Sequence, residues 1–235
     1  MGTKGWIIFA TVAALLLGGL VYMSSANRID VSGYDINKII SADEKNGNIG
    51  DNVFGNKSSK VVLIEYGDYQ CPGCGSAYAR VKPITDKYQG QIAFVFRNLP
   101  ITSLHPNARA AAAVAQAAGL QGKYWEMYDK LFSSQNAWSG ASVSDRTTIF
   151  RGYAESIGLK LDQYDKDVTS EAVNKKINFD QAIFKRTGFQ QATPTFTLDG
   201  KQVPEDVWGS DDKLDAFVRD AITAAGIELP AAEKK

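Results

Sequence analysis

Two cysteines constrain this chain more than any other feature of its sequence. Cys71 and Cys74 are the only cysteines among 235 residues, and only a Pro-Gly dipeptide separates them. They follow residues 61–66, a nearly continuous apolar and β-branched run that is typical of a strand buried on both faces of a sheet. Side chains at this spacing lie within one turn of a helix. We therefore expect a helix directly after a buried strand, with both sulfurs at the junction.

The rest of the chain predicts the sheet to which this junction belongs. Residues 72–90 have a helical pattern, and residues 91–99 form a second apolar run. A crossover of this length joins parallel strands, so the order strand, helix, strand indicates an α/β sheet. Residues 105–188 hold helical patterns only, whereas residues 193–203 predict two short strands and residues 211–226 a last helix. We therefore predict an α/β fold, a small sheet with a helical block inserted at about residues 105–188.

The N-terminal part of the chain has a different composition. Residues 6–23 carry no charge and, at about 1.5 Å per residue, can reach across the hydrocarbon of a bilayer. This run favours a transmembrane anchor after a short cytoplasmic N-terminus, residues 1–5, because Lys4 precedes it. Small residues at 24–26 leave a cleaved signal peptide as the alternative. Both alternatives export the rest of the chain. We expect a single-pass protein of the cell membrane, with its domain in the periplasm or at the cell surface.

Composition also predicts the domain boundaries and excludes some classes of function. Residues 24–58 are rich in Ser, Asn, Gly and Asp and predict a polar stalk, followed by a folded domain at 59–226 and a tail at 227–235. The 26 basic residues balance 26 acidic ones, so we expect no nucleic acid partner. One histidine, His105, beside two thiols leaves too few ligands for a zinc or copper site. We expect neither a metal nor another cofactor.

The cysteine pair is better suited to redox chemistry than to a structural role. A disulfide that closes so short a loop stabilises a protein by only about 2 kcal/mol, which a chain of this size scarcely needs. Pro72 fits the first helical turn, so the helix N-terminus would face the sulfur of Cys71 and favour its thiolate. Cys74, one turn further on, would be shielded. We expect Cys71 to attack a disulfide and Cys74 to resolve the mixed disulfide that results.

Two other positions are candidates whose roles the pattern alone leaves open. Glu65 lies in the apolar strand before the cysteines, either as a solvent-facing acid or as a buried carboxyl that exchanges a proton with Cys74. Pro194 interrupts a strand, which is normal for a strand edge or a bulge. A cis peptide bond there would aim the backbone of Thr193 at a substrate.

Taken together, the ordered segments resemble the thioredoxin superfamily and its DsbA-like branch of exported thiol–disulfide oxidoreductases. The resemblance covers about residues 53–225 and rests on five segments in the family's order, which are "FGNKSSKVVLIEYGDYQCPGC", "FVFRNLP", "HPNARAAAAVAQAAG", "QGKYWEMYDKLF" and "TPTFTLDGK". It implies a thioredoxin fold with an inserted helical block. Strongly oxidising members carry Pro-His between the cysteines, whereas this chain has Pro-Gly, which implies a less oxidising pair.

The resemblance also implies a role for each candidate residue. It makes Cys71 the nucleophile and Cys74 the resolving thiol of a redox-active disulfide, with the cis-proline packed beside them. It makes the strand acid the proton carrier for the buried sulfur, and it leaves His105 a structural residue. The site is then catalytic at Cys71, Cys74, Glu65 and Pro194 and substrate-binding at Thr193, Pro72 and Gly73.

Three functions are compatible with these residues. The first is an enzyme that forms disulfides in exported proteins with cysteine thiols and is reoxidised by a membrane thiol oxidase. The second has the same fold and chemistry but works as a reductase or isomerase fed with electrons. The third is a binding or chaperone module on a thioredoxin scaffold. We favour the first and expect a monomer, because nothing in residues 24–58 is long or apolar enough to form a dimerisation domain.

Overall fold

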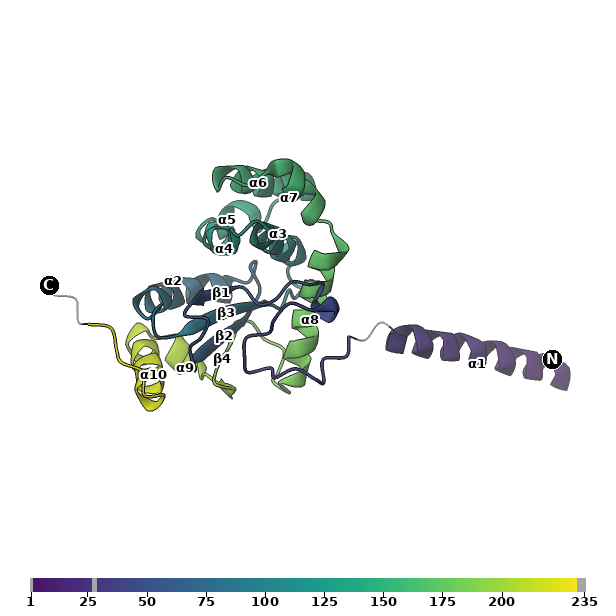
Figure 1. Ribbon diagram of the computed structural model, residues 1–235. Coiled ribbons are helices and arrows are strands. Elements are labelled where there is room, and N and C mark those ends of the chain that lie inside the picture. The colour runs from purple at the N-terminus through teal and green to yellow at the C-terminus, as the bar shows by residue number, and fades with distance from the viewer. Residues whose placement is uncertain (1, 27–28, 232–235) are drawn as a thin grey trace.

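A mixed β-sheet lies at the centre of the computed structural model, which describes residues 2–26 and 29–231. Within these residues the sheet has five strands in the order β1-β3-β2-β4-β5 (Figure 1). β2 and β3 are parallel, and the other neighbouring pairs are antiparallel. The strands are β1 (Val53–Gly55), β2 (Val62–Gly67), β3 (Ala93–Asn98), β4 (Thr195–Leu198) and β5 (Lys201–Gln202). The predicted α/β fold is confirmed, and β1 is a strand that the sequence did not predict.

Helices surround the sheet and form a block beside it. The inserted block lies between β3 and β4, as predicted, and comprises six helices of the described chain, α3 to α8. The helices are α1 (Thr3–Ala26), η1 (Glu44–Asn46), α2 (Pro72–Lys87), α3 (Ala108–Leu120), α4 (Tyr124–Ser133), α5 (Gln135–Trp138), α6 (Val143–Ser156), α7 (Leu161–Asp167), α8 (Glu171–Arg186), α9 (Glu205–Trp208) and α10 (Asp211–Ala224).

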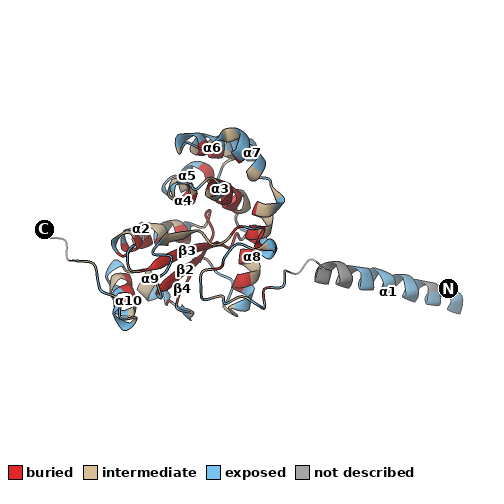
Figure 2. Ribbon diagram, in the orientation of Figure 1, coloured by how far each residue is buried: buried red, intermediate tan, exposed pale blue. Residues whose placement is uncertain are grey.

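The sheet separates two apolar cores because its central strands are buried on both faces. On β2, Leu63 packs in one core with α2, α10 and the helical block, and Ile64 packs in the other with α8. Glu65 is two residues from Leu63 and therefore points to the α2 face. Figure 2 shows the buried residues concentrated in the sheet and α3, with more exposed residues in α6 and α7. Alanine makes α3 both a strong helix former and narrow enough to be packed on most sides.

The structure differs from the predicted polar stalk over residues 24–58. From residue 29 onward the described chain packs on the domain, and Val31, Ile40 and Ile49 are buried. Asp51 is also buried and forms an ion pair with Arg97 of β3. The few apolar residues are spread among polar ones, and the average composition therefore resembles that of a linker. Val31 and Ile40 cover the sheet face opposite α2, together with α8, whereas Ile49 packs in the core on the α2 side.

The prediction of a transmembrane anchor at residues 6–23 is not confirmed. Residues 3–26 are helical, as α1. In the part of the chain that the structure describes, however, no helix has both the length and the apolar character that a membrane crossing needs.

Candidate active site

Cys71 and Cys74 lie where β2 ends and α2 begins, as predicted. Cys71 is the N-cap residue of α2, with an extended backbone, and Pro72 follows at the first helical position, where its missing N–H leaves no hydrogen bond unmade. Cys71 is partly exposed, Cys74 is buried, and both are free thiols. The sulfur of Cys71 lies 3.3 Å from the carbonyl oxygen of Thr193, to which it donates a hydrogen bond in its protonated form. The segment before β4 thus reaches the outer sulfur.

The pKa values of the two thiols are shifted in opposite directions from the ordinary value of a cysteine. A hydrogen bond from the Cys74 side chain, assisted by the backbone N–H groups of Gly73 and Cys74, lowers the pKa of Cys71 to about 5 against the opposing effect of burial. Burial, first, and then the hydrogen bond to Cys71 and the charge of Glu65 raise the pKa of Cys74 well above its ordinary value. The backbone N–H of Asp68 donates to the Cys74 sulfur at 3.4 Å. The outer sulfur is therefore ionised at neutral pH and the inner one is protonated.

Glu65 is fully buried in the middle of β2, which excludes the solvent-facing alternative. It lies opposite Phe96 of β3 and Phe196 of β4. Among the described residues, neither oxygen of its carboxyl group has a hydrogen-bond partner. Burial and, to a lesser extent, the charge of Cys71 raise the pKa of Glu65 well above its ordinary value. A protonated carboxyl near the inner thiol can give up or accept one proton as the sulfurs change state.

Thr193 and Pro194 complete the site. They lie in the segment that follows the helical block in the sequence and precedes β4. The Thr193–Pro194 peptide bond is cis, as the resemblance implied. A Cβ atom built on Gly73 would lie 3.3 Å from Cδ of Pro194 and 3.5 Å from the Cys71 sulfur. The proline ring thus packs against the spacer between the two cysteines. The structure brings Cys71, Pro72, Gly73, Thr193 and Pro194 together where β2 ends, with Glu65 within β2 itself.

The polar side chains of Asp68, His105 and Gln135 hold the turn before Cys71, and the sequence had indicated a structural role only for His105. The carboxylate of Asp68 accepts hydrogen bonds from the backbone N–H groups of Gln70 and Ile101. His105 contacts the same carboxylate through Nδ1 at 2.8 Å, which fits its predicted structural role. Gln135 donates from α5 to backbone carbonyls of this turn. A lone polar residue in a helix carries no pattern that could have indicated Gln135.

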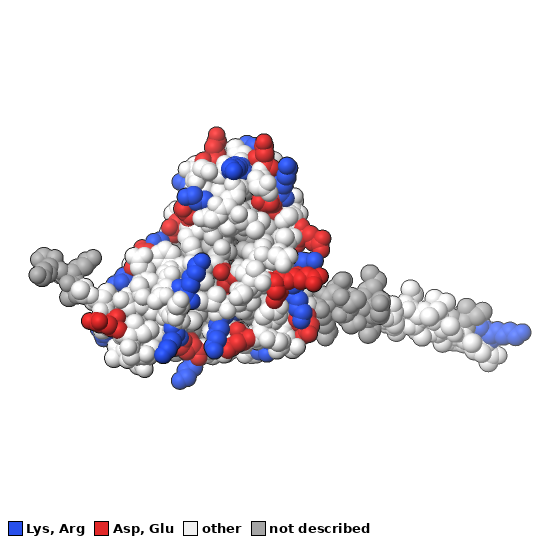
Figure 3. Space-filling model, viewed as in Figure 1, with Lys and Arg blue, Asp and Glu red and all other residues white. Residues whose placement is uncertain are grey.

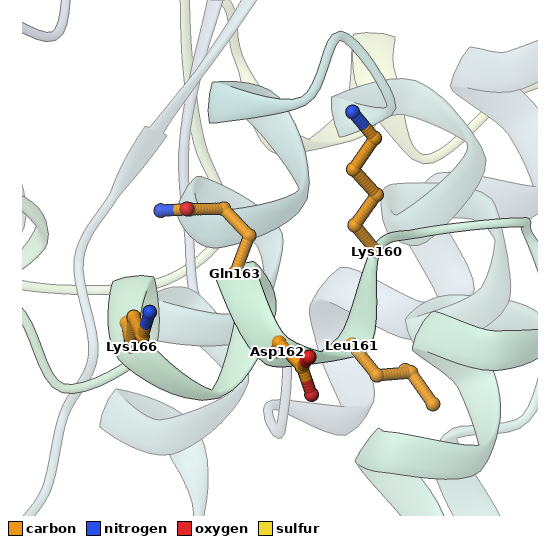
Figure 4. Close-up of a pocket in the computed structure, with 5 residues that line it drawn as sticks. All are labelled: Lys160, Leu161, Asp162, Gln163 and Lys166. Atoms are coloured by element: carbon orange, nitrogen blue, oxygen red, sulfur yellow. The ribbon is translucent and has the colours of Figure 1, made fainter.

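Two of the cavities lie in different places, one beside the cysteine site and one away from it. One, of about 410 Å³, borders the cis-proline and is lined by Gln190, Ala192, Pro194, Thr195, Gln202, Val203, Pro204, Glu205 and Trp208. The other, of about 580 Å³, lies along α7 and is lined by Lys160, Leu161, Asp162, Gln163 and Lys166 (Figure 4). The second cavity shares no residue with the cysteine site. In the described ranges, no group of three or more His, Cys, Asp or Glu side chains is arranged to hold a metal ion.

Charged residues of both signs are mixed on the molecular surface. On the face shown in Figure 3, Lys and Arg side chains alternate with Asp and Glu over the sheet and the helical block. This mixture agrees with the balance of 26 basic and 26 acidic residues. The face shown therefore presents no extended field of one sign.

Comparison with known proteins supports this description. The model of the thioredoxin family matches residues 47–220. The Na⁺/H⁺ antiporter NhaA 1 of Salinispora arenicola is 32% identical over 207 residues, which cover 83% of this chain and 29% of the antiporter. This chain thus spans less than a third of that relative's length.

Two solved structures are similar over most of their length. A thioredoxin-like oxidoreductase from Silicibacter pomeroyi is 30% identical, with a TM-score of 0.59, and the match covers 74% of this chain and 92% of that one. The thiol–disulfide exchange protein α-DsbA2 from Wolbachia pipientis is 21% identical, with a TM-score of 0.59 and coverage of 73% and 87%, and shares the fold. From its family match over residues 47–220, the chain belongs to the thioredoxin family.

Proposed function

We propose that the protein is a DsbA-like thiol–disulfide oxidoreductase that forms disulfide bonds in exported proteins, with Cys71 as its nucleophile. The opposite pKa shifts of Cys71 and Cys74 carry the proposal. A thiol of pKa about 5 is almost fully ionised at neutral pH, which stabilises the reduced form of the pair. A stabilised reduced form makes the corresponding disulfide a stronger oxidant. The pair is therefore suited to accept electrons from substrate thiols.

The proposed reaction begins with the Cys71–Cys74 disulfide. A substrate thiolate attacks the sulfur of Cys71, a mixed disulfide forms, and Cys74 leaves with the electron pair. Glu65 donates its proton to that sulfur, because burial raises the pKa of Cys74 well above its ordinary value, and the Glu65 carboxylate then takes up a proton from water. A second substrate thiolate attacks the substrate sulfur of the mixed disulfide and releases Cys71 as a thiolate. The substrate loses two electrons and the enzyme gains them.

Substrate binding is assigned to the surface beside the outer sulfur. Pro72 is exposed, and Gly73 and Thr193 are partly exposed around Cys71. The cavity of about 410 Å³ next to Pro194 continues this surface and includes the apolar side chain of Trp208. We propose that the backbone of Thr193 pairs with an extended substrate segment whose neighbouring side chain enters this cavity.

The proposed setting is outside the cytoplasm, because disulfides persist in oxidising compartments. We propose that residues 1–26 direct the export of the domain, and that a membrane thiol oxidase restores the Cys71–Cys74 disulfide after each cycle. Cell fractionation and protease accessibility of the intact chain test the location. A domain that is protected in intact cells and free in the cytosolic fraction would contradict it.

The direction of electron flow is tested by the reduction potential of the pair. The full chain is equilibrated with glutathione buffers, and the reduced fraction is measured by thiol alkylation. A value toward about −120 mV supports the oxidase, whereas a value near about −270 mV favours a reductase. Because the spacer is Pro-Gly and not the Pro-His of strongly oxidising relatives, we expect a reduction potential between these two values.

The roles of the two cysteines are tested separately. Cys71→Ser should abolish oxidation of a reduced substrate protein, because no sulfur then accepts the substrate thiolate. Cys74→Ser should accumulate a mixed disulfide between enzyme and substrate, which non-reducing electrophoresis detects. Full oxidase activity of Cys71→Ser would refute the assignment of Cys71 as the nucleophile.

A further inference from the structure

The short helix α5 is fixed within the inserted helical block. Its last residue, Trp138, is completely buried and donates from Nε1 to the carbonyl oxygen of Leu131 at 2.9 Å. The Trp138 ring also meets the ring of Phe150 edge to face, with 5.2 Å between centroids. α5 therefore presents its first residue, Gln135, from a rigid support.

Gln135 reaches from this support to the turn that carries the outer cysteine. Its Nε2 donates to the carbonyl oxygen of Tyr69 at 2.7 Å and to that of Cys71 at 2.9 Å. The same Cys71 carbonyl accepts the first hydrogen bond of α2, from the backbone N–H of Gly75 at 3.1 Å. One carboxamide thus binds the backbone on both sides of residue 70, at the point where α2 starts.

A second contact between the same elements supports this arrangement. The side chain of Gln70 donates in the opposite direction, from Nε2 to the carbonyl oxygen of Ser139 at 2.7 Å. Residues 135–139 and residues 69–71 are therefore joined by three hydrogen bonds that involve two glutamine side chains.

Gly75 leaves the space that Gln135 occupies. A Cβ atom at Gly75 would lie 2.6 Å from Oε1 of Gln135, closer than any normal contact. Glycine inside a helix costs about 1 kcal/mol relative to alanine. The chain has this unfavourable residue in the first turn of α2, where only glycine admits the carboxamide.

We propose that Gln135 is a positioning residue of the redox site, which fixes the start of α2 so that its first N–H groups face the sulfur of Cys71. The proposal rests on the proposed role of Cys71 as the nucleophile. It means that the helical block sets the reactivity of the cysteine pair from outside the thioredoxin core. The carboxamide does not touch the reacting sulfur, and its effect passes through the backbone of residues 69–75.

The first test replaces Gln135 with methionine, which keeps the length of the side chain but cannot donate. The pKa of Cys71, followed by thiolate absorbance at 240 nm in the reduced full chain, should rise by about one unit. The equilibrium with glutathione should shift about tenfold toward the disulfide, which corresponds to about 30 mV toward a less oxidising pair.

A matched control lies in the same block. Gln121 also joins two segments through its carboxamide, with hydrogen bonds to the backbone N–H and carbonyl of Lys160. Gln121→Met therefore removes a comparable polar contact that involves neither α5 nor the cysteine turn. This variant should leave both the pKa of Cys71 and the glutathione equilibrium unchanged.

The second test displaces Gln135 without altering it. Gly75→Ala should push the carboxamide away while improving helix propensity, so the variant should fold at least as well as the parent chain. It should nevertheless raise the pKa of Cys71, and the rise should vanish when Gln135→Met is already present. This second variant keeps the proposal testable even if Gln135→Met fails to fold.

The outcomes separate this proposal from the proposed function. An unchanged Cys71 pKa in folded Gly75→Ala or Gln135→Met would overturn the positioning role, whatever the enzyme's direction. A shifted pKa together with full activity of Cys71→Ser would retain the positioning role and reject the nucleophile.

Discussion

At the scale of single residues, the buried carboxyl of Glu65 makes the native protein sensitive to pH. Its pKa is raised chiefly by burial, and an unfolded chain would ionise it at about 4.3. Between that pH and the raised pKa of the folded state, the native protein binds one proton more than the unfolded chain. Native stability from this group is complete below about pH 4.3 and is lost as the pH rises toward the folded pKa.

Glu65→Gln should therefore stabilise the reduced protein at neutral pH and leave it unchanged near pH 4. The wild type should lose up to about 1.4 kcal/mol of unfolding free energy per pH unit within this window relative to the variant. Urea unfolding from pH 4 to pH 8 measures the difference. Glu155→Gln, at an exposed position, is the control. Parallel pH profiles for wild type and Glu65→Gln would contradict the expectation.

The reactive residues could be predicted from local patterns, whereas their supports could not. Glu65 could be predicted because it interrupts an apolar run, and Cys71 because it follows that run in a Cys-x-x-Cys pair. Gln135 and Asp68 were not, because hydrogen bonds from polar side chains to distant backbone leave no periodic pattern. Gln135 reaches carbonyls 66 and 64 positions away along the chain. Only the fold shows which polar residues meet.

At the scale of elements, buried ion pairs join three segments that are distant in the sequence. Asp51, just before β1, pairs with Arg97 of β3 at 2.8 Å and with Lys176 of α8 at 2.9 Å. Burial alone would raise the pKa of Asp51, but the charges of Arg97 and Lys176 outweigh it and hold the pKa well below its usual range. Asp51 therefore stays ionised between two cations in the interior.

Asp51→Asn should destabilise the protein by about 3–5 kcal/mol, because it leaves the buried Arg97 without its counter-charge, although Lys176 keeps its ion pair with Asp180. The matched control is Asp206→Asn, which breaks an exposed pair with Lys213 and should leave the stability almost unchanged, because solvent screens that pair. Chemical denaturation of both variants measures the two losses. Equal losses would show that burial of the network adds nothing to its strength.

The strands illustrate which elements a sequence reveals. The apolar runs at 61–66 and 91–99 correspond to β2 and β3, because strands buried on both faces are uniformly apolar. β1 escaped prediction since it has three residues, too few for an alternating pattern to appear. It is nevertheless fixed by antiparallel pairing with β3, a contact that becomes available only after folding.

At the scale of the whole molecule, the N-terminal segment belongs to the domain. Val31, Ile40 and Ile49 bury apolar surface worth about 1.5–3 kcal/mol each, and Asp51 adds its ion pairs. Their sum is comparable with the total stability of a domain, about 5–15 kcal/mol. The boundary of the folding unit thus lies before residue 31, well ahead of the predicted residue 59.

Two shortened chains should separate these contributions. A chain of residues 29–235 should unfold at the same temperature as the full chain. A chain of residues 52–235 should lack a cooperative transition, because it loses the cover of one sheet face and the partner of Arg97. Differential scanning calorimetry makes the comparison. A common midpoint for the two shortened chains would mean that residues 29–51 are not part of the folding unit.

The contact between the Cys71 sulfur and the Thr193 carbonyl joins positions 122 residues apart. A ribosome makes Cys71 and Cys74 first and the segment around Thr193 much later, after the whole helical block. Through that interval the pair lacks the proline that packs against its spacer, and β4 has not yet joined the sheet. The nascent chain thus carries two thiols that the fold does not yet cover. Because the chain has no third cysteine, these thiols cannot form a non-native disulfide within the same molecule. The order of synthesis makes the redox site one of the last parts of this protein to be completed.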